Sequence, residues 1–97
     1  MITSSQTLVE SSLECLRSKK AEEIVVMNLS KASDIADYFI VCTGGSDLHV
    51  RAIADAVVEG LEEQGVHVWH VEGYEGGRWV LIDLVDVVVH IFQAVTR

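Results

Sequence analysis

The sequence predicts a single α/β domain of the α+β kind, in which one mixed five-stranded sheet packs with two main helices. The expected order is helix, strand, strand, helix, strand, strand, strand. Three observations predict this class. Two segments repeat apolar residues at helical spacing, five short runs are rich in β-branched residues, and no proline, repeat or low-complexity segment divides the chain. A length of 97 residues then allows one domain, residues 1–97.

The first helix is expected over residues 5–20, where apolar side chains recur every three or four positions. Its start has two readings. Thr7 and Glu10 have the spacing of a capping box, whereas Ser4 or Ser5 could act as the N-cap one turn earlier.

The second helix has the clearer start. Ser46 is a good N-cap, and Asp47 places a negative charge at the positive end of the helix dipole. Apolar positions then follow at helical spacing from Val50 to Leu61. Gly65 suits the left-handed residue that commonly follows a helix.

The five strands are expected at Ile24 to Leu29, Tyr38 to Thr43, Val66 to Val71, Arg78 to Asp83 and Val87 to Phe92. The second helix connects the second strand to the third, so these two strands are expected to be parallel neighbours or near neighbours. The other connections are short, which favours antiparallel pairing.

One face of this sheet is expected to lack an intramolecular cover. Two helices cover only one face of five strands, yet residues 79–82 and 87–92 are apolar on both faces. An uncovered apolar patch of roughly several hundred Å² is unusual on a monomer. The cover would be a second copy of the chain, a different partner, or a further C-terminal segment.

The charge balance excludes some partners. Fifteen acidic residues oppose seven Lys and Arg, for a net charge of -8. Residues 1–51 hold seven acids and five bases, a balance of -2, while residues 52–97 hold eight acids and two bases, a balance of -6. Without a basic cluster, direct reading of nucleic acid is not expected. The acidic half instead favours a basic protein partner.

Composition also bears on the compartment. The chain is 49% hydrophobic, too apolar for a disordered protein, but no apolar run is long enough to cross a membrane. No signal or transit segment precedes the first helix, so the cytoplasm is the expected location. Cys15 and Cys42 are expected to behave as small buried hydrophobes.

Three groups of residues could carry chemistry. Thr43 to Asp47, between a strand and a helix, resembles the Gly-Ser turn of nucleotidyltransferases, but no carboxylate pair follows and Asp47 would repel a phosphate. His67 and His70 point to opposite faces if both lie on a strand, so neither a metal site nor a cofactor is expected. Asp83 and Asp86 bracket a tight turn, where Asp is commonly structural.

Trp79 is open to two interpretations. The period of two in a strand puts it on one face with Leu81 and Asp83, and puts His90 on one face with Phe92. A large aromatic residue beside acids could anchor a partner, or it could belong to the core.

The combined motifs resemble the ribosomal silencing factor family, also called Iojap-like. The motifs are the segment Asp37 to Ser46, the Val71-Glu72-Gly73 turn, and Trp79 to Asp83 followed by Asp86 to Phe92. The resemblance covers roughly residues 5–95. It implies a nucleotidyltransferase-like fold without transferase activity.

The resemblance also implies a function. Family members bind ribosomal protein fourteen of the large subunit, block joining of the two subunits, and reduce translation in starvation or stationary phase; related organellar proteins act in large-subunit assembly. Dimers are common in the family. Members usually continue past the position of Arg97 with a further helix, and this domain is expected to lack it. A nucleotide-binding or residual nucleotidyltransferase domain remains the alternative.

The residues that match the family's shared motif positions are the expected partner-binding set: Glu72, Trp79, Leu81, Asp83, Asp86, His90 and Phe92. Within this set, Trp79 and Leu81 are expected to be apolar anchors, and Asp83 or Asp86 to face basic side chains. His90 is expected to orient the sheet or a turn carboxylate instead.

Overall fold

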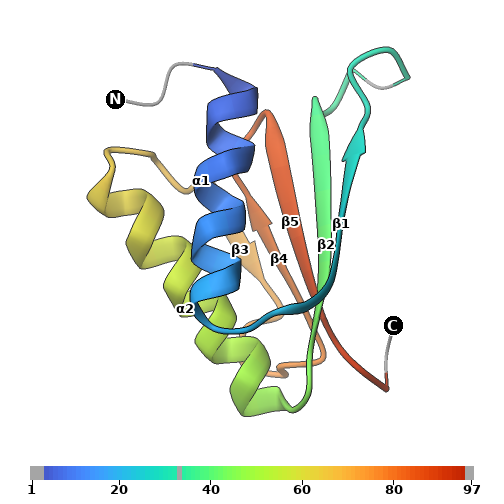
Figure 1. The fold of residues 1–97 in the computed structure, drawn as a ribbon, viewed down its shortest axis with the longest axis vertical. Helices are drawn as coiled ribbons and strands as arrows, with labels where there is room; N and C mark the ends of the chain where they lie inside the picture. Colours follow the sequence, from blue (N-terminus) through green and yellow to red (C-terminus); the bar gives the residue numbers. More distant parts are fainter. Residues whose placement is uncertain (1–3, 33, 96–97) are drawn as a thin grey trace.

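Two helices lie on the same side of a five-stranded sheet (Figure 1). The computed structural model describes residues 4–32 and 34–95. The elements in chain order are α1 (Ser5–Ser18), β1 (Glu22–Asn28), β2 (Tyr38–Gly44), α2 (Asp47–Glu63), β3 (His70–Glu72), β4 (Trp79–Asp83) and β5 (Val87–Gln93). This confirms the expected mixed α+β class and its element order.

Both helices begin at a serine cap. The Ser4 hydroxyl accepts a hydrogen bond from the Thr7 N–H at 3.1 Å, so α1 starts at the earlier of its two expected positions. The Ser46 hydroxyl accepts from the His49 N–H in the same way. The first helix ends at Ser18, two residues before the expected end, because Lys20 adopts a left-handed backbone with φ 58°.

The end of α2 follows the expected glycine stop. Gly65 has φ 82°, and the Val66 N–H reaches back to the Leu61 carbonyl at 3.0 Å. This pairing satisfies a carbonyl that the last turn of the helix would otherwise leave without a partner.

The sheet order is β1-β2-β5-β4-β3. Strand β2 pairs parallel with β5, while the β1–β2, β4–β5 and β3–β4 pairs are antiparallel as expected. Strands β2 and β3 therefore run in the same direction, but they are not neighbours, since β5 and β4 lie between them. The strand β5 is buried along most of its length, which suits the centre, whereas the three-residue β3 suits an edge.

The expected third strand, Val66 to Val71, is wrong in its first part. Only His70–Glu72 forms a strand. Val66 and Val68 pack against the core, which explains their apolar character. They have no strand to pair with, because β4 ends at Asp83 and turns away, so the last ladder contact is from the Trp69 N–H to the Asp83 carbonyl.

The core lies between the sheet and the helices. Its largest fully buried side chains are Leu16, Ile40, Ile53, Leu61, Ile82 and Ile91, with Cys42 beside them. The other expected buried cysteine, Cys15, is only half-buried, and its Sγ would lie 2.7 Å from a Cβ added at Gly60 of α2. The two helices therefore approach closely at this point.

The alternate residues of the strands form the other side of the sheet, which we call the open face. The helix-side residues Ile40, Val80 and Val89 fix the alternation, because successive side chains point to opposite faces. The open face consists of Glu22, Val25 and Met27 of β1, Phe39, Val41 and Thr43 of β2, Val88, His90 and Phe92 of β5, Trp79, Leu81 and Asp83 of β4, and His70 and Glu72 of β3.

Candidate partner-binding face

Six of the seven expected partner-binding residues lie together on the open face. The strand register places Trp79 opposite Phe92, Leu81 opposite His90, and Glu72 opposite Leu81. Asp83 lies opposite both Val88 and His70. The seventh residue, Asp86, lies elsewhere.

Aromatic rings form the centre of this face. The Trp79 and Phe92 rings stack with centroids 5.2 Å apart and an interplanar angle of 18°. The Trp79 indole Nε1–H donates a hydrogen bond of 3.1 Å to His90 Nδ1. Trp79 nevertheless stays 51% exposed. It is therefore a surface residue held by its neighbours, not a member of the core.

His90 is almost completely enclosed, at 9% exposure. Its Nε2 is buried and has no hydrogen-bond partner among residues 4–32 and 34–95. Burial lowers the pKa of the imidazole below its ordinary value of 6.5, because a charged ring would lose its hydration. The ring is therefore neutral at neutral pH. It orients an indole, not the turn carboxylate considered from the sequence.

Strands β1 and β2 contribute residues that the motif did not single out. The Phe39 ring packs against His90 with centroids 4.8 Å apart. Val41 lies beside His90, and Val25 and Met27 pair with Val41 and Phe39 across the β1–β2 ladder. The period of two within residues 38–43 predicts that Phe39 and Val41 share a face. It does not predict that this face adjoins His90, because that depends on the parallel β2–β5 register.

Acidic side chains lie toward the β3 side of the open face. Glu72 forms a 3.0 Å ion pair with His70 when that imidazole is charged. Asp83 Oδ1 accepts a hydrogen bond of 2.8 Å from the Val85 N–H, so this carboxylate also shapes the β4–β5 turn. The residue is partly exposed at the border of the face.

An apolar pocket continues the open face beyond Asp83 and Val88. Its remaining lining residues are Ile35, Trp69 and Val85, all more than half exposed, and its volume is about 370 Å³. They come from the β1–β2 connection, the segment before β3 and the β4–β5 turn. The apolar surface is thus larger than the Trp79 cluster alone.

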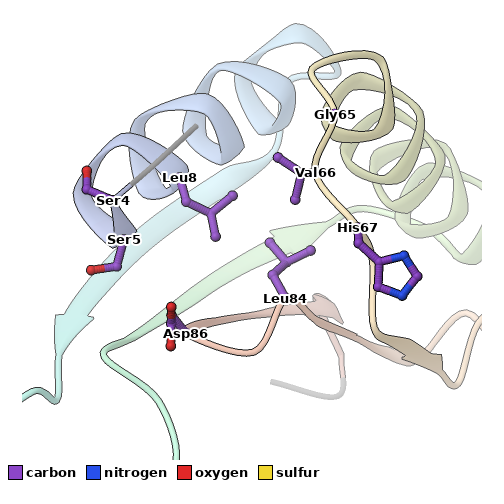
Figure 2. A pocket seen from close by; sticks show the side chains of 8 residues that line it. All are labelled: Ser4, Ser5, Leu8, Gly65, Val66, His67, Leu84 and Asp86. Atoms are coloured by element: carbon purple, nitrogen blue, oxygen red, sulfur yellow. The ribbon is translucent and has the colours of Figure 1, made fainter. Parts of the chain in front are cut away.

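Asp86 lies on the helix side of the molecule. Figure 2 shows it below the first turn of α1, in a pocket that it lines together with Ser4 and Ser5. Its backbone carbonyl accepts from the N–H groups of Asp37 and Tyr38 at 2.7 and 3.1 Å. The first turn of α1 contains no acidic residue of its own, and Asp86 lines the pocket at that end of the helix, where a negative charge is favourable.

The Gly-Ser turn before α2 forms hydrogen bonds with the first turn of that helix. The Gly45 N–H donates to His49 Nδ1 at 2.9 Å, and the same ring bonds the Lys19 carbonyl through Nε2 at 2.7 Å. Asp47 pairs with Arg51 at 2.7 Å, and this hydrogen bond holds the Asp47 pKa below its usual value. A negative charge and a used N–H donor therefore stand where a phosphate would bind.

The candidate metal ligands are dispersed. His67 lies in the pocket of Figure 2, whereas His70 lies on the open face. In the described parts of the chain, no three His, Cys, Asp or Glu side chains gather in a way that could hold a metal ion. Neither described helix is long and apolar enough to cross a bilayer.

Comparison with known proteins agrees with this arrangement. The sequence model of a family described as "Ribosomal silencing factor during starvation" matches residues 2–97. The chain is 46% identical over 90 residues to the ribosomal silencing factor RsfS of Halalkalibacterium halodurans, covering 93% of this chain and 77% of the relative. It is 45% identical over 75 residues to RsfS of Bacillus subtilis, covering 77% and 64% of the two chains.

A solved structure matches the fold as well. The crystal structure of a protein from Chromobacterium violaceum superimposes with a TM-score of 0.92 at 36% identity, covering 94% of this chain and 76% of that one. The fold is thus that of a small α+β protein already known in crystals. The chain belongs to the ribosomal silencing factor family, which confirms the resemblance noted in its motifs.

Proposed function

We propose that the chain is a non-enzymatic repressor of translation in the cytoplasm. It binds ribosomal protein fourteen of the large subunit through the open face and thereby prevents the small subunit from joining, under starvation or in stationary phase. A contribution to large-subunit assembly belongs to the same proposal. The observation that carries it is the aromatic cluster of Trp79 and Phe92, left exposed on a sheet face that no described helix covers.

The chemistry of the face supports a protein partner. Interface hot spots are enriched in tryptophan, surrounded by apolar contacts that exclude water. Trp79 has this setting, with Leu81 and Phe92 beside it and Phe39 beyond His90. Glu72 and Asp83 at the border would meet cationic side chains, as expected for a basic ribosomal protein.

The absence of an enzymatic role is also part of the proposal. A nucleotidyltransferase would need backbone N–H donors at the Gly-Ser turn and converging carboxylates. The Gly45 N–H is already bonded to His49, and the neighbouring Asp47 is held in its charged form by Arg51. These contacts favour a structural turn over a nucleotide site.

Co-sedimentation with isolated large subunits tests the proposal. Wild-type protein should sediment with them and reduce the formation of joined ribosomes when small subunits are added. Trp79→Ala should weaken binding by about 2 kcal/mol or more, roughly 30-fold. Leu48→Ala is the matched control, because Leu48 is a comparably exposed apolar residue (71%) on α2. Equal binding by wild type and a folded Trp79→Ala protein would refute the assigned face.

A second copy of the chain is the other occupant that this test must separate. Self-association through the open face would compete with ribosome binding. Light scattering at the concentrations of the binding experiment gives the mass of the free protein. A Trp79→Ala variant that changes this mass while leaving subunit binding intact would assign the face to a homodimer.

A further inference from the structure

We propose that His90 is a positioning residue of the partner-binding face, which holds the Trp79 indole in its docking orientation without touching the partner. This rests on the proposed function of the open face. It divides the motif residues into those that make contact and those that act through another side chain.

The hydrogen bond between the two rings defines the first half of the argument. Trp79 Nε1–H donates to His90 Nδ1 at 3.1 Å, so Nδ1 is an acceptor and the neutral ring carries its proton on Nε2. Nε1 is the single polar atom of the indole. Because that atom is used within the sheet, the exposed half of Trp79 presents only hydrocarbon to a partner.

Stacking alone would not fix this orientation. The Phe92 and Trp79 ring centroids lie 5.2 Å apart, with an interplanar angle of 18°. Such a stack fixes the plane of the indole, but it does not fix the direction in which Nε1–H points within that plane. The bond to His90 selects one such direction. An anchor that is already in its bound orientation loses less conformational entropy on docking.

The other nitrogen explains why His90 is not itself a contact. Nε2 is buried and unpartnered among the described residues, with Phe39 packed against the ring at 4.8 Å. A phenylalanine at position 90 would fill this apolar site without burying an unsatisfied N–H, which is a costly group. The acceptor at Nδ1 is therefore the property that distinguishes histidine from phenylalanine here.

A double-mutant cycle on binding to large subunits tests the assignment. His90→Phe should weaken binding on the order of fivefold to tenfold, the effect of losing one net hydrogen bond. In a Trp79→Phe background, which lacks the indole N–H but keeps a ring, the same change should cost less than about twofold. Equal weakening in both backgrounds, or none in the wild-type background, overturns the proposal.

The indole resonances of the free protein give a second reading that does not depend on the ribosome. In a ¹⁵N–¹H spectrum, the Trp79 indole N–H should shift upfield and exchange faster with solvent in His90→Phe. It should stay near its wild-type position in His90→Asn, whose side-chain oxygen can accept in place of Nδ1. The Trp69 indole is the internal reference, and Trp79→Phe makes the assignment.

These two readings separate the failure of each idea. If wild-type protein does not bind large subunits, the proposed function fails, while a shifted Trp79 resonance still establishes the positioning contact. An unmoved resonance in His90→Phe overturns the positioning role whatever the ribosome does.

Discussion

At the scale of single residues, His90 lies between two aromatic side chains. Its ring packs against Phe39 on one side and accepts a hydrogen bond from the Trp79 indole N–H on the other. Burial is the single cause that lowers its pKa. Its cross-strand neighbours on the open face, Val41 and Leu81, carry no titratable group. The titratable groups farther along that face, among the described residues, are Glu22, Glu72, His70 and Asp83.

The lowered pKa predicts a stability that falls in mild acid. The unfolded chain binds a proton at His90 near pH 6.5, whereas the folded chain resists it, so the free energy of unfolding decreases as the pH drops below about 6.5 toward the folded pKa. Urea unfolding at pH 7.5 and 5.5 measures this loss. His90→Phe should lose less stability over the same interval, and an equal loss would contradict the assignment.

Much of the residue-level site was predictable, but the partnership of His90 was not. The period of two in a strand correctly placed Trp79, Leu81 and Asp83 on one face. The pairing of Trp79 with Phe92, and of Leu81 with His90, depends on a register that no local pattern encodes. Of the two expected roles of His90, orienting the sheet or orienting a turn carboxylate, the second is wrong, because Nδ1 accepts from Trp79 and Nε2 has no partner among the described residues.

At the scale of elements, the β3–β4 turn fixes the start of the strand that carries Trp79. Gly73 has φ 78°, and a Cβ at this position would lie 2.1 Å from the Trp79 carbonyl oxygen. Arg51 donates to the Glu75 carbonyl at 3.1 Å, which ties the turn to α2. The turn thus has little freedom to adjust.

Gly73→Ala should destabilise the protein by more than about 2 kcal/mol, since a left-handed backbone and a steric clash both oppose the methyl group. Gly76→Ala, in the same turn, is the control, because its Cβ would meet nothing closer than 3.8 Å and its φ is not positive. Thermal unfolding of the two variants compares them. A similar melting temperature for both would mean that the turn relaxes freely.

The two aspartates around the β4–β5 turn should separate by function. Asp86→Asn should lower stability by about 0.3–1 kcal/mol, less at high salt, because the negative charge near the start of α1 is lost, and should leave ribosome binding unchanged. Asp83→Asn should weaken binding, while the amide oxygen can keep the bond to the Val85 N–H. Unfolding curves and subunit binding on both variants test this division; the reverse pattern would contradict it.

Local sequence signals predicted the helix boundaries better than the strands, because a helix forms its hydrogen bonds within one segment. The serine caps and Gly65 set the helix boundaries from within the helices themselves. The strand predicted from Val66 failed because strand formation needs a partner, and the apolar side chains of Val66 and Val68 pack into the core without one.

At the scale of the whole molecule, the net charge of -8 should influence how fast the protein meets the ribosome. Attraction to a basic partner steers association and is screened beyond about 10 Å at 0.1 M salt. The association rate should therefore fall between low and high salt. Stopped-flow mixing with large subunits measures it.

Two variants show which part of the surface produces the salt effect. Asp83→Asn should make the rate less sensitive to salt, whereas Trp79→Ala should weaken binding mainly through faster dissociation and keep the wild-type salt dependence. A salt response that is the same in Asp83→Asn as in wild type would place the steering charges elsewhere.

The strand order of the sheet was the feature that the sequence predicted least well. Short connections correctly predicted the antiparallel pairs, but the parallel partner of β2 is β5, not the strand after the crossover helix. Both faces of β5 are apolar, and this pattern indicates a central strand without specifying its neighbours.

The central place of β5 makes the sheet depend on the most C-terminal of its described strands. It joins the β1–β2 pair to the β4–β3 pair, so the five-stranded sheet is incomplete until residues 87–93 have been synthesised. The same strand carries His90 and Phe92, which support Trp79. A nascent chain that has not yet completed β5 would therefore lack the docking surface proposed above.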